Sequence, residues 1–226
     1  MIFPCWLTLD RAFARGEKWI PLDATGVIQL SDTHYSKTWK AMEQLVKTGK
    51  ARAIGVSNFN EQKLKELLRT SEITPAVNQI EAHPYLQQPS LKSFCESKGI
   101  LVTAYSPLGN NQTGEIKAVD DPVVADICKE LDFDMNPGQL LVSWAVQRGT
   151  IVLPKSVTES RINSNLQVNE LPREAVEKLN NLERNKRFND SSKRWGYDIF
   201  DEVGLEVVKR SAREAGSENL MKFGSW

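Results

Sequence analysis

The residues best suited to bind a ligand lie between positions 155 and 161. Lys155 and Ser156 directly follow a short apolar run, and Arg161 comes five residues later, at the start of a predicted helix. An ammonium, a hydroxyl, a guanidinium and the N–H groups of a helix N-terminus together suit a phosphate. The guanidinium can also stack on an aromatic base. The segment therefore predicts a phosphate site, and judged by charge alone a solvated basic turn explains it equally well.

Three other polar groups follow apolar runs in the same way. They are Ser57-Asn58, Gln79 to Glu81, and Tyr105 to Gly109. Such side chains can hydrogen-bond an amide, stack on a ring and surround phosphates. Each group alone is typical of an ordinary turn or helix cap. Four groups at equivalent positions favour one shared binding site.

Composition limits the classes of protein that this chain can belong to. Its 226 residues include 29 basic and 29 acidic side chains, and 40% of the residues are apolar. A chain without net charge has no general attraction for nucleic acid or an anionic membrane, and no apolar run approaches the roughly 18 residues of a membrane-spanning helix. The apolar start, which Pro4 interrupts, lacks the basic residues of a secretory signal. We therefore expect a soluble, cytoplasmic protein with a hydrophobic core.

The sequence lacks several common cofactor signatures. No G-x-G-x-x-G follows a strand and no G-x-x-x-x-G-K-[ST] is present, so neither that type of dinucleotide fold nor a P-loop is supported. Cys5, Cys95 and Cys128 are odd in number and widely spaced, which indicates neither a disulfide framework nor a zinc site. We expect no bound metal.

Apolar runs typical of strands alternate with helical patterns along the chain. Strands are predicted over 53–57, 77–80, 100–105 and 151–153, and helices over 35–47, 61–68, 89–97, 123–131, 138–147, 159–166 and 173–182. This alternation implies parallel strands joined by crossover helices, an α/β fold with its site at the strand C-termini. The pattern does not distinguish an open sheet from a closed barrel.

Four segments together resemble the aldo-keto reductase family. They are 41–59, 78–84, 104–109 and 153–165, and they stand in the family's order and spacing between about Phe13 and Val168. The resemblance implies a (β/α)8 TIM barrel and an oxidoreductase that uses NADPH/NADP+. Its substrates would be small aldehydes or ketones, which it would reduce to alcohols, as alditol- or glycerol-dehydrogenase-like enzymes do.

The resemblance also implies a role for each matching residue. The nicotinamide carboxamide would be held by Ser57, Asn58 and Gln79, and its ring would stack on Tyr105. The pyrophosphate would be lined by Ser106, Leu108 and Asn110. The 2′-phosphate would be bound by Lys155, Ser156 and Arg161, and the adenine by Asn165. Ser164 replaces a Glu of many relatives, which weakens the adenine contact. Trp19 and Ile20 stand where relatives line the substrate pocket, and a hydrophobic anchor under a loop explains them equally well.

The chain departs from the family in its first half. The four predicted strands correspond to the fifth to eighth of the barrel, while the family's catalytic Asp, Tyr and Lys come from the first half. Its catalytic His belongs to a His-Trp-Pro, and Thr8-Leu9-Asp10 stands at that place. We assign no catalytic residue, and we expect His83 to be structural.

The chain is therefore expected to form a single incomplete, truncated barrel domain over 1–226. Residues 1–10 would be an atypical start, 11–33 a loop, 34–183 the β/α units and 184–226 a polar, irregular C-terminal tail. Open strand edges would invite self-association. Three hypotheses remain open: a reductase, a catalytically inactive NADP-binding fragment or truncated gene product, and a protein that binds no ligand.

Overall fold

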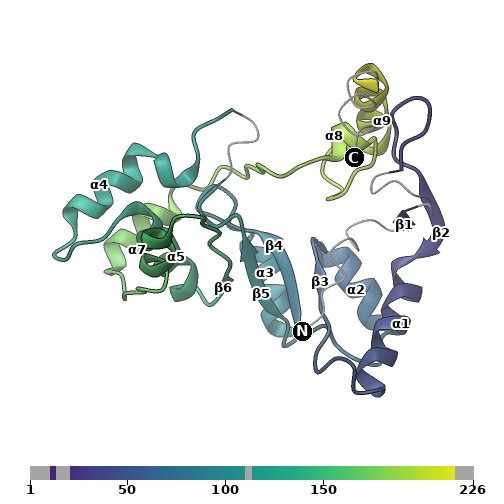
Figure 1. Ribbon diagram of the computed structural model, residues 1–226, viewed down its shortest axis with the longest axis horizontal. Helices are drawn as coiled ribbons and strands as arrows, with labels where there is room; N and C mark the ends of the chain where they lie inside the picture. The colour runs from purple at the N-terminus through teal and green to yellow at the C-terminus, as the bar shows by residue number, and fades with distance from the viewer. Residues whose placement is uncertain (1–10, 14–20, 110–113, 217–226) are drawn as a thin grey trace. The chain divides into compact units, whose positions relative to one another are not determined.

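The computed structural model describes residues 21–109 and 114–216, together with the backbone of 11–13. The chain divides into two compact units (Figure 1). Unit 1 comprises Met1–Ala76 and Asp190–Trp226, and unit 2 comprises Val77–Asn189.

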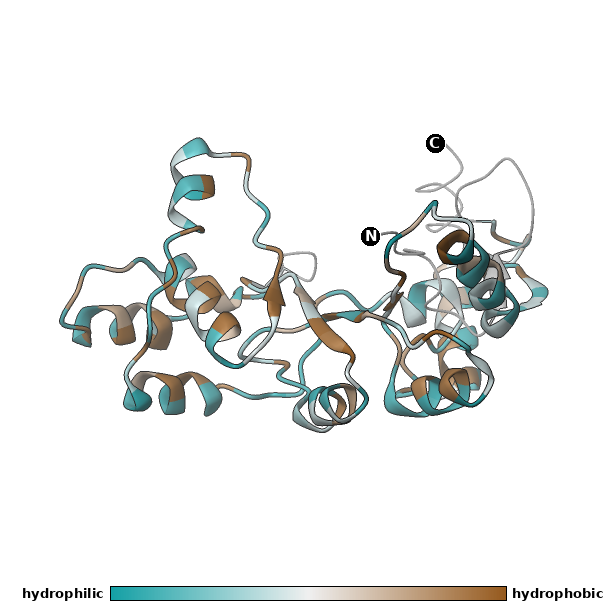
Figure 2. Ribbon diagram, turned by 90° about the horizontal axis from the view of Figure 1, so that it is seen from below, coloured by the Kyte–Doolittle hydropathy of each residue, from teal (hydrophilic) through white to brown (hydrophobic). Residues whose placement is uncertain are grey.

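Unit 2 contains a parallel sheet in the order β4-β5-β6. Its strands are β4 (Val77–Glu81), β5 (Leu101–Tyr105) and β6 (Ile151–Val152), with Gln79 opposite Thr103 and Glu81 opposite Tyr105. Most residues of the two longer strands are buried, as expected for strands covered on both faces. The strands of the sheet carry apolar stretches, which are brown in Figure 2, but β4 also contains the polar residues Asn78, Gln79 and Glu81. The parallel α/β architecture predicted from the sequence is confirmed.

Helices connect these strands, and their ends follow local capping rules. α3 (Pro89–Ser97) joins β4 to β5, and the 3-10 helix η1 (Ala118–Asp120), α4 (Pro122–Glu130) and α5 (Pro137–Gln147) lie between β5 and β6. α6 (Glu159–Ser164) and α7 (Arg173–Asn180) follow β6. A proline stands in the first turn of α3, α4 and α5, where its missing N–H costs no hydrogen bond.

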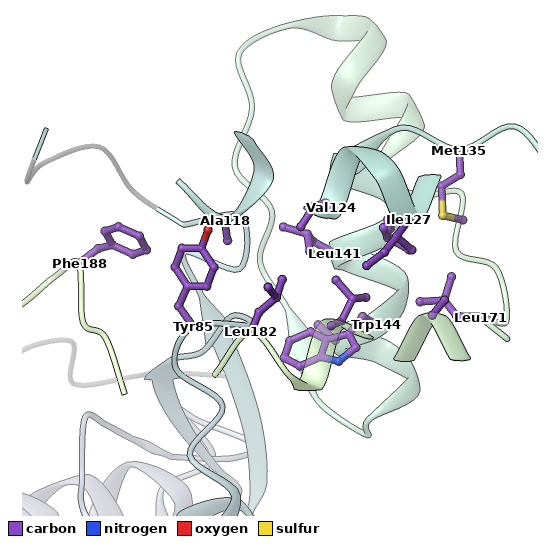
Figure 3. Close-up of a cluster of buried hydrophobic side chains, with 14 residues drawn as sticks. Tyr85, Ala118, Val124, Ile127, Met135, Leu141, Trp144, Leu171, Leu182 and Phe188 are labelled. Atoms are coloured by element: carbon purple, nitrogen blue, oxygen red, sulfur yellow. The ribbon is translucent and has the colours of Figure 1, made fainter. Parts of the chain in front are cut away.

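One hydrophobic cluster holds α4, α5 and α7 together. Trp144 is a fully buried member of this cluster, and its indole Nε1–H donates to Asn180 Oδ1 at 2.9 Å. The labelled side chains around it come from several elements and point toward one another (Figure 3). The buried members are Tyr85, Ala118, Val124, Ile127, Met135, Leu140, Leu141, Trp144, Ala145, Leu171, Ala175, Leu179, Leu182 and Phe188.

Unit 1 is built around α1 (Tyr35–Lys47) and α2 (Glu61–Thr70), with the short strand β3 (Val56–Ser57) between them. His34 caps α1 and Asn60 caps α2, each by accepting a backbone N–H. The buried carboxylate of Glu43 accepts the N–H groups of Glu72 and Ile73 at 2.7 and 3.0 Å. This bond ties α1 to the segment that follows α2.

The C-terminal segment of unit 1 contains α8 (Ser192–Trp195) and α9 (Leu205–Glu214). Ile199 and Phe200 pack with Ile28 in a small apolar cluster. The buried Lys63 Nζ donates to the Ile199 carbonyl at 2.8 Å, so α2 and this segment are joined by a hydrogen bond as well as by packing.

Several predicted boundaries were wrong. β3 and β6 are shorter than the predicted runs 53–57 and 151–153, and α6 ends at Ser164 instead of 166. The loop expected over 11–33 contains β1 (Arg11–Phe13), which pairs antiparallel with β2 (Leu30–His34). The tail is not irregular, because α9 buries Val208 and Ala212 along one face.

No helix in the described part of the chain is both long and apolar enough to cross a membrane. Within the same residues, no three His, Cys, Asp or Glu side chains form a group that could hold a metal ion.

Candidate functional site

Unit 2 contains a cavity of about 440 Å³ at the end of its sheet. Four segments line it: the loop after β5, the region of η1, the first turn of α5, and the stretch from β6 into α6. The lining residues are Leu108, Lys117, Val119, Asp120, Asn136, Pro137, Gly138, Lys155, Ser156, Arg161, Ser164 and Asn165. The cavity therefore gathers the predicted phosphate residues and the predicted adenine residue.

Two of the three basic side chains that line the cavity are available to a ligand. Lys155 and Arg161 are exposed, and neither forms an ion pair with another of the described residues. Ser156 Oγ accepts the Thr158 N–H at 3.1 Å, which shapes the turn before α6. Ser164 Oγ donates to the Arg161 carbonyl at 3.1 Å and fixes the end of that helix. These contacts hold the backbone around α6, and both cationic residues line the cavity.

The opposite wall of the cavity is formed by the start of α5. Asn136 and Gln139 form a reciprocal capping box, with both hydrogen bonds at 3.0 Å. A Cβ on Gly138 would lie 3.2 Å from Asn136 Oδ1 and 3.8 Å from Asn165 Oδ1. The Asn165 carboxamide therefore lies against the first turn of α5, and an added Cβ at Gly138 would crowd Asn136 but make only ordinary contact with Asn165.

A tight turn after β5 supplies Leu108 to the cavity. Ser106 has the left-handed φ of 48°, and the Gly109 N–H donates to its carbonyl at 2.9 Å. Gly109 has φ 80°, and a Cβ there would lie 2.6 Å from the Ala118 nitrogen. Only glycine allows this approach, so the turn packs closely on η1.

The other predicted cofactor residues of unit 2 lie on the sheet. Gln79 is half-buried in β4, and Tyr105 is the last residue of β5. Ser106 Oγ accepts Asn189 Nδ2–H at 3.2 Å. In unit 1, Ser57 is buried at the end of β3, and Asn58 follows with a left-handed φ of 58°. Asn110, Trp19 and Ile20 lie outside the described residues.

Sequence reasoning missed half of the cavity wall. Lys117 lies 3.8 Å from Asp120 in an ion pair, and both line the cavity. No local sequence pattern marks Lys117 or Asp120 as a cavity residue, because only the packing of η1 brings them to the cavity wall. The wall at Asn136 could have been found from the sequence, because Asn136 followed three residues later by Gln139 is a capping-box pattern that marks the start of a helix.

A buried polar network lies behind the strand ends. Glu81 and His83 are both 0% exposed, and His83 Nε2 lies 3.0 Å from Glu81 Oε1. Burial raises the pKa of Glu81, but hydrogen bonds from His83, Phe188 and Asn189 outweigh it, so the pKa lies below its ordinary value. That His83 is structural stays a prediction, and its full burial beside Glu81 favours it.

A second buried group lies beside α4. The Tyr85 hydroxyl donates to Asp121, which also caps α4 through the Val123 N–H at 2.8 Å. Burial and the bond to Asp121 raise the pKa of Tyr85 to about 12. Arg184 stacks 4.0 Å above the Tyr85 ring and lies 3.1 Å from Asp121. Tyr85 therefore stays protonated and packs in the core.

Comparison with known proteins relates most of the chain to one enzyme family. The model of the Aldo/keto reductase family matches residues 19–184. The chain is 45% identical over 184 residues to aldo-keto reductase family 1 member A1-A of Danio rerio, covering 78% of this chain and 56% of that protein. It is 41% identical to glycerol 2-dehydrogenase (NADP(+)) of Saccharomyces cerevisiae, covering 79% and 57%.

A solved structure is also similar. The aldose reductase of Giardia lamblia superposes with a TM-score of 0.80 at 33% identity, covering 88% of this chain and 67% of that one. The chain spans about half the length of the curated relatives it matches.

Proposed function

The chain belongs to the aldo/keto reductase family, and on that premise we propose that it binds NADP(H) in the cavity of unit 2 for the reduction of aldehydes or ketones to alcohols. The observation that carries this proposal is the pair of exposed cations, Lys155 and Arg161, which line one cavity with Ser156 and Asn165. A phosphate with two negative charges is the ligand that such a group recognises best.

In this proposal each wall of the cavity contacts a different part of the cofactor. Lys155, Ser156 and Arg161 bind the 2′-phosphate, and Asn165 contacts the adenine beside the first turn of α5. The Ser106 hydroxyl and the Leu108 backbone lie along the pyrophosphate. Gln79 and Tyr105, farther along the sheet, receive the nicotinamide.

We propose, as the family resemblance implies, that Ser57 and Asn58 also contact the nicotinamide carboxamide and that Asn110 contacts the pyrophosphate. We also propose that Trp19 and Ile20 line the substrate pocket. The Danio and yeast relatives motivate a small carbonyl compound or a polyol of the glycerol type as substrate.

We propose that β3 to β6 correspond to the fifth to eighth strands of a (β/α)8 barrel. In support, Ile151 on β6 and Leu153 just after it are 42% and 46% exposed, as expected where a strand lacks a neighbour. A single domain over 1–226 and a cytoplasmic location remain predictions. Nothing in the described residues supports self-association through open strand edges.

Catalysis needs a proton donor as well as a cofactor. Bound NADPH supplies the hydride, and a positioned acid typically contributes about 10² to 10⁴ in rate. His83 is unsuited to that role, because its ring is fully buried against Glu81 and Phe188. We therefore propose that this chain alone binds the cofactor and reduces carbonyls slowly at most.

Titration of NADPH fluorescence tests the binding proposal. We expect wild type to bind and Arg161→Ala to raise the Kd at least about tenfold, the value of a charge-assisted hydrogen bond. Arg173→Ala is the matched control, because that side chain is 92% exposed on α7 and pairs with Glu177. Absence of binding in wild type would refute the proposal, and turnover of a small aldehyde measures the catalytic part separately.

A further inference from the structure

The proposed cofactor site depends on Ser106, and a residue 83 positions later along the chain holds its hydroxyl. We propose that Asn189 is a positioning residue that turns the Ser106 O–H toward the cofactor pyrophosphate. This inference rests on the proposed function, because it assigns Ser106 to that ligand.

The first step is the direction of the hydrogen bond. Asn189 Nδ2–H donates to Ser106 Oγ at 3.2 Å. A serine hydroxyl has one hydrogen to donate and two lone pairs that accept. Because Asn189 occupies a lone pair, the Ser106 hydrogen remains free to donate elsewhere. Phosphate oxygens only accept hydrogen bonds, so this orientation suits a pyrophosphate.

The second step is the rigidity of Asn189. Its backbone N–H donates to Glu81 Oε2 at 3.1 Å, and the Phe188 N–H donates to Glu81 Oε1 at 2.8 Å. The buried Phe188 ring packs against His83 at 5.1 Å between ring centroids. It also packs against Tyr85 at 6.1 Å, and both of these rings are labelled in Figure 3. A residue whose backbone N–H and preceding neighbour are held in this way can orient its partner with little loss of entropy on ligand binding.

The third step is the shape of the turn that Ser106 begins. Its left-handed φ of 48° is rare for a residue other than glycine, asparagine or aspartate. The turn carries the chain from the end of β5 to Leu108 on the cavity wall. The bond from Asn189 therefore links the sheet end to the loop that would face the pyrophosphate.

Reversal of the bond's direction tests the proposal. Asn189→Asp keeps the shape, but its carboxylate accepts the Ser106 O–H and turns the lone pairs toward the ligand. We expect the NADPH Kd to rise at least about tenfold in Asn189→Asp and about threefold in Asn189→Ala. Adenosine 2′-monophosphate, which carries a 2′-phosphate and no pyrophosphate, should bind all variants as it binds wild type. Asn181→Ala, an exposed asparagine after α7, is the control.

A double-mutant cycle shows whether Asn189 acts through Ser106. In the Ser106→Ala background, Asn189→Ala should change the NADPH Kd less than about 1.5-fold. Additive effects, or equal weakening of NADPH and adenosine 2′-monophosphate, would overturn the proposal. Unchanged NADPH binding in Asn189→Ala would also overturn it while leaving the proposed function intact. If wild type does not bind NADPH, the proposed function itself fails. The cycle uses only alanine variants, so it decides the question even if Asn189→Asp does not fold.

Discussion

Replacement of Glu81 by glutamine should destabilise unit 2 strongly. The Glu81 carboxylate is fully buried and accepts three hydrogen bonds, from His83 Nε2 at 3.0 Å and from the N–H groups of Phe188 and Asn189 at 2.8 and 3.1 Å. Glutamine offers one oxygen and one NH2 group in the same space. At least one donor would then face another donor and lose its partner.

The expected cost follows from these three bonds. A buried donor left without a partner costs about 1–3 kcal/mol, and the remaining bonds lose the extra strength that a charged acceptor gives. We therefore expect Glu81→Gln to lower the free energy of unfolding by about 2–4 kcal/mol. For a domain of roughly 100 residues this corresponds to a fall in Tm of about 10 °C or more.

The effect should depend on pH. The pKa of Glu81 is below its ordinary value in the folded chain, because the hydrogen bonds to its carboxylate outweigh the effect of burial. A carboxyl with a lowered folded-state pKa stabilises the fold above its unfolded pKa, and loses that contribution as pH falls through the folded value. The difference in free energy of unfolding between wild type and Glu81→Gln should therefore be largest at pH 7 and become smaller below about pH 4.5.

Urea unfolding followed by circular dichroism measures the change in free energy, and amide exchange at Phe188 and Asn189 measures its local origin. Glu170→Gln serves as the control, because that side chain is exposed in the same unit. Stability of Glu81→Gln within about 0.5 kcal/mol of wild type at pH 7 would refute this reasoning. So would a difference that stays constant from pH 7 to pH 3.

Three other substitutions test separate parts of the structure. Gly109→Ala should lower the free energy of unfolding by about 2 kcal/mol or more and weaken NADPH binding. Gly114→Ala is the control and should keep the NADPH affinity, because nothing lies within 4 Å of its added Cβ. Urea unfolding and NADPH titration measure both variants. Trp144→Ala should lower the free energy of unfolding in urea by about 3–5 kcal/mol, because it removes a large, fully buried side chain from the core cluster. Lys63→Met should make the C-terminal segment several-fold more sensitive to limited proteolysis, and the exposed Lys65→Met should not.

The sequence predicted elements well wherever capping and periodicity agreed. The bounds of α1 and α3 are those expected, 35–47 and 89–97, and α2 begins after Asn60 as predicted. Strand ends were less predictable, because an apolar run shows burial and not the extent of the hydrogen-bond ladder. Ile54, for example, accepts the Ala76 N–H at 2.9 Å although β3 begins only at Val56.

The missed elements have two physical causes. β1 and β2 depend on pairing between segments separated in the chain, which local pattern does not report. α9 was locally visible, since Leu205, Val208 and Ala212 have helical spacing, but its surroundings are polar. The apolar cluster of Ile28, Ile199 and Phe200 shows that this tail has a core of its own.

About half of the candidate site could be predicted. Lys155, Ser156, Arg161 and Asn165 lie close together in sequence, and they line one cavity with Leu108. The expected grouping was wider, because Gln79, Tyr105 and Ser106 are not among the lining residues of this cavity. Lys117 and Asp120 come from a region between β5 and α4 whose path depends on the Gly109 turn. Only tertiary packing determines that they face the same cavity.

Binding of NADPH and NADH to the same preparations measures the central claim most directly. Lys155 and Arg161 can distinguish the two cofactors only through the 2′-phosphate, so wild type should bind NADPH at least about tenfold more tightly than NADH. Lys155→Met should reduce this ratio severalfold and leave the NADH Kd unchanged. Equal affinity of wild type for the two cofactors, or an unchanged ratio in Lys155→Met, would contradict the account.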